Sequence, residues 1–226
     1  MRRLLFALLL SLGALPPAAA QTDINALLNE TQRVRREGNR VQLIWWIPDE
    51  YWEASTKGEA AANPQQLRSL LKLVDGYMIF AAVDAELDAR LSLRSRPPAD
   101  LAAGFQVLLS DGTRLQPVAE AQLSPELRSF FKVMRPLIAG MLGQLGQGLE
   151  FIALPGRQAG GARVADPLRE GRFTVMLDQA KFEWRLPLGS LLPPVFDGKT
   201  GEQFPGDYRF NPYSGDALKP QRPAQR

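Results

Sequence analysis

The chain has 226 residues, of which 23% are charged, and its formal net charge is +3 at neutral pH. It contains no histidine and no cysteine. These absences exclude Ser-His-Asp triads, thiol nucleophiles, disulfides and metal sites built on His or Cys within this chain. Basic and acidic residues nearly balance and form no basic stripe, so we expect no nucleic acid among its partners. We also expect no metal and no cofactor.

The first twenty residues have the pattern of a signal peptide. Arg2 and Arg3 precede an apolar run over 4–15, and three alanines over 18–20 offer a cleavage site before Gln21. The apolar run is shorter than the roughly 20 residues of a membrane-spanning helix, and no second run of that length exists, so we expect no stable membrane anchor. The sequence therefore predicts a periplasmic or secreted protein.

Helical and alternating patterns share the N-terminal half of the chain. Apolar residues from Ile24 to Val34 recur at helical spacing, whereas those from Tyr77 recur at every second position. The predicted elements here are helices over 22–38, 48–55 and 64–75 and strands over 41–47, 77–83 and 87–94, with a turn near Asp84.

The C-terminal half has the clearest hairpin and the longest helix. Asp111-Gly112 is a typical tight-turn pair, and Ser124 followed by Pro125 is a typical helix start. The predicted elements are a hairpin of 105–109 with 113–118, a helix from 125 to 145 kinked near Pro136, a strand over 149–154 and a hairpin of 173–177 with 182–186.

These elements add up to an α+β fold with a mainly antiparallel sheet built from hairpins and about four helices, because no repeated strand-helix-strand order is present. We expect the α+β domain to cover 21–194. A small ribbon-like segment over 195–218 and a disordered, proline-rich tail over 219–226 follow it.

One cluster combines aromatic and acidic side chains, and it supplies our candidate binding residues: Trp46, Asp49, Glu50, Trp52 and Glu53. Aromatic faces stack on sugars and cations, and two carboxyl groups beside a sugar-binding groove suffice for a glycosidase. The alternative is that the tryptophans pack in the core while the acids stabilise a helix start. We assign no catalytic residue.

Two hypotheses about function follow from these patterns. The first is a secreted, non-enzymatic binding or interaction domain for an unknown protein or glycan ligand. The alternative is a carboxylate-based hydrolase that acts on cell-wall or other glycans. The face of the long helix is rich in Met and Leu, which is typical either of a membrane or partner contact or of a helix folded onto a sheet.

Two short segments near the C-terminus repeat one pattern. Asp197-Gly-Lys-Thr200-Gly201 is echoed by Asn211-Pro-Tyr-Ser214-Gly215. With Asp197, Thr200, Asn211 and Ser214 in place of four thiolates, this region resembles a degenerate zinc ribbon, and two plain glycine turns are the alternative reading.

The segments 45–52 and 184–194 are also similar to uncharacterised secreted bacterial proteins that end in such a ribbon. That resemblance implies a C-terminal knuckle without metal and carries no activity with it.

Overall fold

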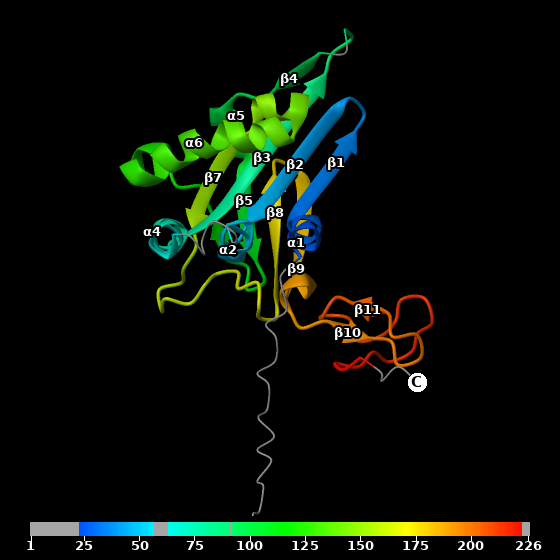
Figure 1. Ribbon diagram of the computed structural model, residues 1–226. Coiled ribbons are helices and arrows are strands. Elements are labelled where there is room, and N and C mark those ends of the chain that lie inside the picture. The colour runs from blue at the N-terminus through cyan, green and yellow to red at the C-terminus, as the bar shows by residue number, and fades with distance from the viewer. Residues whose placement is uncertain (1–22, 57–62, 91, 223–226) are drawn as a thin grey trace, which may run out of the picture.

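The protein is an α+β structure of two antiparallel sheets that pack face to face, with a long helix across the outer face of the larger sheet (Figure 1). The computed structural model describes residues 23–56, 63–90 and 92–222. The expected signal peptide and the end of the expected tail lie outside these ranges. The fold class therefore agrees with the sequence-based expectation.

Five strands form the larger sheet, and its centre is the long strand β3. β2 pairs with β1 on one side and with β3 on the other, while β3 pairs with β7 through its first half and with β4 at its end. The strands are β1 (Gln32–Glu37), β2 (Arg40–Ile47), β3 (Tyr77–Leu87), β4 (Leu93–Ser95) and β7 (Glu150–Pro155). β1 and β7 consequently form opposite edges of this sheet.

The smaller sheet has the order β6-β5-β8-β9. Its strands are β5 (Phe105–Leu109), β6 (Arg114–Leu115), β8 (Gly171–Leu177) and β9 (Ala180–Leu186). Along β8 and β9 apolar residues alternate with polar ones, so one face turns inward. Phe173 stacks on Trp184 with ring centroids 5.1 Å apart, and Trp46 of β2 meets Phe173 edge to face at 5.0 Å. The main core therefore lies between the two sheets.

Five helices of the described residues surround the two sheets, and the longest of them lies over the outer face of the larger sheet (Figure 1). They are α1 (Ile24–Thr31), α2 (Asp49–Ser55), α4 (Pro64–Val74), α5 (Pro98–Gly104) and α6 (Pro125–Met141), with short 3-10 turns η1 (Glu120–Gln122), η2 (Gly143–Gly148) and η3 (Gly189–Leu191). Ser124 caps α6, since its hydroxyl accepts a hydrogen bond from the Leu127 N–H at 3.1 Å. Phe131 of α6 stacks on Phe151 of β7 at 4.7 Å, which fixes α6 over that edge of the sheet.

Four charged side chains tie the two sheets together at one end, and we call them the inter-sheet clamp: Arg40, Asp84, Arg96 and Asp178. Asp84 is buried and accepts from Arg40 and Arg96. Arg96 also donates to Asp178, which lies in the turn between β8 and β9, at 2.6 Å. The clamp therefore joins strands of both sheets through alternating charges.

The edge formed by β1 is covered by arginine. Arg33 donates through its Nε to the Glu183 carbonyl of β9 at 3.0 Å, and its guanidinium lies 5.0 Å from the Trp184 ring centroid. Arg35 and Arg36 add further charge to this edge. Charged side chains on an edge strand oppose pairing with another chain.

A small unit follows the second sheet and contains β10 (Val195–Phe196) and β11 (Gln203–Phe204). It lies to one side of the two sheets (Figure 1). Asp197 and Asn211 are both buried and joined by a hydrogen bond, and Gly201 and Gly215 adopt φ values of +71° and +76°. The two repeated segments therefore form similar turns that face each other, while the likeness to a zinc ribbon stays a prediction.

Three local expectations were wrong in their boundaries. The predicted helix over 22–38 ends at Thr31, because residues 32–37 form β1, which turns at Gly38 to pair with β2. The turn expected near Asp84 is absent: β3 continues to Leu87, since the clamp arginines neutralise this carboxylate. Of the predicted strand over 87–94, Leu87 is the last residue of β3 and residues 93–94 belong to β4, while 88–90 lie outside any strand.

Other elements follow the expected pattern. The strand over 41–47, the helices over 48–55 and 64–75 and the hairpin of 173–177 with 182–186 are present with small shifts of their ends. The hairpin after 105–109 is also present, but its second strand covers only Arg114–Leu115 of the predicted 113–118. The long helix ends at Met141 instead of Leu145, because Gly143 turns the chain with a φ of +60°. α5 had no counterpart among the predicted elements, and the kink near Pro136 stays a prediction.

Candidate functional site

The structure places both tryptophans of the predicted cluster in the core. Trp46 is 2% exposed and lies between the sheets, and Trp52 is 3% exposed and packs edge to face on Phe130 of α6 at 5.3 Å. Neither ring offers a free face to a ligand in this conformation. The pocket that touches Trp46 and Asp49 has a volume of only about 30 Å³, which is room for a water molecule or two.

The two acids at the start of α2 share one partner. Arg163 donates to an oxygen of Asp49 at 2.7 Å and to an oxygen of Glu50 at 2.6 Å. Burial raises the pKa of Asp49 to about 6, and Arg163 partly opposes this rise. Glu53 lies on the exposed side of α2. The two acids and Arg163 therefore form a partly buried ionic cluster that holds the loop before β8 against α2.

A much larger hollow of about 890 Å³ lies between α5, α6, the segment 117–125 and β7, and we call it the β7 groove. Its lining residues come from these four elements: Pro98, Ala99, Ala102, Pro117, Val118, Glu120, Leu123, Pro125, Arg128, Ser129, Phe131, Lys132, Arg135 and 150–153. Apolar side chains from three of these elements, Val118, Leu123 and the stacked pair Phe131 and Phe151, give it an apolar lining.

The β7 groove runs along a strand edge with open backbone groups. The Val118 N–H donates to the Ala153 carbonyl at 2.8 Å, so this carbonyl points away from β3. In an antiparallel ladder such groups recur at every second residue, so the N–H and carbonyl of Phe151 and the N–H of Ala153 point to the same side. Within the described residues, β7 forms one backbone hydrogen bond outside its ladder with β3, and this is the bond from the Val118 N–H.

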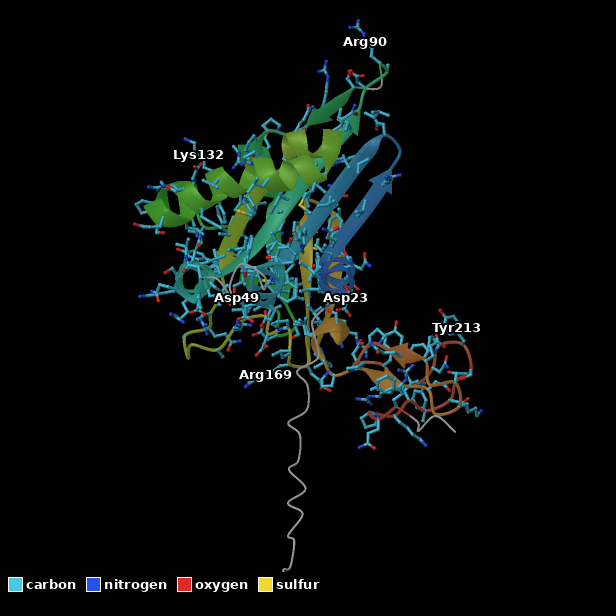
Figure 2. The ribbon with its side chains drawn as sticks, viewed as in Figure 1. Asp23, Asp49, Arg90, Lys132, Arg169 and Tyr213 are labelled. Atoms are coloured by element: carbon cyan, nitrogen blue, oxygen red, sulfur yellow. The ribbon has the colours of Figure 1, made fainter. Side chains whose placement is uncertain are left out.

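Charged groups stand on both sides of the β7 groove. Arg135 pairs with Glu150 at 2.7 Å, and burial raises the pKa of Glu150 while Arg135 opposes that rise. Arg128 donates to the carbonyls of Glu120 and Leu123 at 3.1 Å, which holds the turn at η1. Lys132 projects from α6 (Figure 2) and forms no salt bridge with a described residue. This ammonium is therefore free to meet an anionic group of a ligand.

Comparison with protein-family models, curated proteins and solved structures gave no match for this chain. The function proposed below therefore rests on the geometry of the protein alone. None of the helices in the described ranges is long and apolar enough to cross a membrane. Over the same ranges, no three acidic side chains gather where they could hold a metal ion.

Sequence reasoning missed the β7 groove because its walls are far apart in the chain. Arg128, Lys132 and Arg135 recur at helical spacing along one side of α6, and this was the one signal available from the sequence. The predicted cluster and the β7 groove share no residue.

Proposed function

We propose that this protein is a non-enzymatic binding domain that takes an extended polypeptide segment in the β7 groove. The observation that carries the proposal is the open backbone edge at Phe151 and Ala153 beside an apolar lining. An extended peptide can add a strand to such an edge, where main-chain hydrogen bonds supply affinity and pockets for alternate side chains supply selectivity.

The size and lining of the β7 groove support this ligand class. Its volume of about 890 Å³ lies at the upper end of ordinary ligand sites. Phe131 and Phe151 would contact apolar side chains of the peptide, and Lys132 would pair with an acidic one. Val118 already bonds the Ala153 carbonyl on this edge, so the added strand would begin beside that bond and continue along β7.

One matched pair of variants tests the proposal. Ala102 lines the β7 groove, whereas the adjacent Ala103 is exposed and does not. The purified protein is applied to an array of overlapping peptides that together cover the sequence of α-lactalbumin. The dissociation constant of the peptide that binds best is then measured by fluorescence anisotropy. We expect Ala102→Trp to weaken binding at least tenfold and Ala103→Trp to leave it unchanged.

The same peptide with N-methylated backbone amides separates strand addition from side-chain binding, because it keeps every side chain and loses the donors. We expect its binding to be lost. An array without any binding peptide, or equal binding by Ala102→Trp and the parent protein, would refute the proposal.

A second candidate is the carboxylate-based glycan hydrolase, and Glu150 favours it. This side chain lines the β7 groove together with Glu120, its pKa is raised by burial, and the negative charge of Glu120 raises it further. A glycosidase uses such a pair of acids. Both oxygens of Glu150 are held by Arg135, which is why we rank this candidate second. Hydrolysis of chitin, cellulose or cell-wall fragments that Glu150→Gln abolishes would favour it.

A further inference from the structure

The C-terminal unit carries the exposed aromatic rings of the described chain. Tyr208, Phe210 and Tyr213 are 41%, 62% and 85% exposed, and they lie within six residues of one another. All four tryptophans are buried in the body of the protein. Figure 2 shows Tyr213 at the outer side of the unit, away from both sheets.

A buried phenylalanine supports two of these rings. The Phe204 ring centroid is 6.3 Å from that of Tyr208, with an angle of 22° between the planes, and 6.5 Å from that of Tyr213. Each contact leaves much of the tyrosine ring uncovered. The two tyrosines therefore offer exposed aromatic surface next to one buried ring.

The backbone beneath the rings is fixed. Phe204 belongs to β11, and Tyr213 lies in the turn whose N–H groups are held by the Asn211 side chain. The Asp197 to Asn211 hydrogen bond joins that turn to the one before β11. The backbone of this turn therefore loses little conformational entropy when a ligand binds here.

The chemistry of this surface indicates its partner. Residues 195–222 carry four basic and four acidic side chains, so the unit has no net charge to attract a polyanion. Its exposed large apolar residues are all aromatic, whereas the exposed aliphatic ones lie in the body of the protein: Val34, Val133, Leu137, Met141 and Leu168. The flat apolar face of a sugar ring stacks on aromatic rings, and this surface supplies such rings without exposed large aliphatic side chains.

We propose that Tyr208 and Tyr213, supported by Phe204, form a stacking platform for an uncharged polysaccharide. Phe210 extends the aromatic surface, and the polar side chains of Gln203 and Arg209 are exposed neighbours in the sequence that can bond sugar hydroxyls. This site is separate from the β7 groove and does not depend on the function proposed for it.

The test is retention of the full chain on two uncharged polysaccharides, chitin and microcrystalline cellulose, measured as depletion from solution. We expect at least one of them to retain the protein. Tyr213→Ala and Tyr208→Ala should each weaken retention about tenfold, and Tyr213→Phe should keep it. Leu168→Ala, an exposed apolar change in the body, is the matched control and should have no effect. Near-ultraviolet circular dichroism of the buried tryptophans confirms that each variant is folded.

Two results would overturn the proposal. One is that neither polysaccharide retains the protein, and the other is that both tyrosine-to-alanine variants are retained like the parent. Retention that is lost in Ala102→Trp instead of in the tyrosine variants would assign the polysaccharide to the β7 groove and would equally refute the platform.

Discussion

The side-chain amide of Asn211 donates a hydrogen bond of 2.8 Å to the carboxylate of Asp197, and both side chains are buried. The other carboxylate oxygen of Asp197 accepts from the backbone N–H groups of Lys199 and Thr200. The amide oxygen of Asn211 accepts from the backbone N–H groups of Tyr213 and Ser214. This buried contact therefore joins the two turns that organise the C-terminal unit, and an exposed ion pair of 2.8 Å between Lys199 and Asp216 lies beside it.

Removing this contact should loosen the C-terminal unit while leaving the sheets intact. In Asn211→Ala the Asp197 carboxylate loses a buried donor, and a lost hydrogen bond of this kind changes an opening equilibrium roughly five- to tenfold. We expect limited proteolysis to cut after residue 194 faster by that factor. The control is Glu202→Ala, which alters an exposed side chain of the same unit that forms no hydrogen bond or ion pair with a described residue. Equal cleavage of the two variants would contradict the prediction.

The inter-sheet clamp should make the protein sensitive to loss of one charge. Asp84 is 2% exposed, so Asp84→Asn leaves Arg40 and Arg96 without their buried partner, at a cost of about 3 kcal/mol. Urea unfolding at pH 7 measures this free energy. Glu37→Gln, which removes an exposed ion pair with Arg35, should cost less than about 1 kcal/mol.

Acid should act on the same group. Burial raises the pKa of Asp84, but hydrogen bonds from Arg40 and Arg96 outweigh burial and hold it below the ordinary value. A lowered folded-state pKa gives stability that is complete above about pH 4 and is lost as the pH falls further. The stability gap between the parent and Asp84→Asn should therefore shrink below pH 4.

Asp49 should produce the opposite pH dependence. Its pKa is about 6 in the folded protein, mainly because of burial, and near 4 when unfolded, so the native state binds more protons between these values. Stability should fall as the pH rises from 4 to 6, by up to about 3 kcal/mol, since one pKa unit corresponds to about 1.4 kcal/mol. Asp49→Asn should lack this component. Glu53→Gln, at an exposed acid of the same helix, should retain it.

Trp46→Ala and Trp52→Ala test whether these rings are core or ligand platform. Both are buried, so each truncation should cost about 3 to 5 kcal/mol of unfolding free energy in urea. An exposed platform residue such as Tyr213 should cost less than about 1 kcal/mol when truncated. Full stability of Trp46→Ala would contradict the packing between the two sheets.

Local patterns were most informative where burial follows the sequence period. Phe173 to Leu177 and Phe182 to Leu186 alternate cleanly because one face meets the core and the other water, so their hairpin was predictable. Ile24 to Val34 also matched a helix, but pairing of residues 32–37 with β2 decided the structure, and such pairing depends on a second segment. Propensity is a weak signal when tertiary contacts compete with it.

The same limit applies to the candidate sites. Trp46 and Trp52 stood out in the sequence as large aromatic residues near acids, yet the second sheet and α6 bury them. The β7 groove depends on how α5, α6 and β7 meet, which no local period encodes. The aromatic face of the C-terminal unit was visible in the sequence as Tyr208, Phe210 and Tyr213, but only the structure shows which of its rings are exposed.

The unequal edges of the larger sheet bear on how many chains can assemble. Arg33 closes the β1 edge against β9, and α5 and α6 wall the open edge of β7 on both sides. A strand seated beside Phe151 would present its own outer edge to those walls and not to water. Strand addition would therefore stop after one partner, which gives a complex of fixed one-to-one stoichiometry in place of a growing fibre.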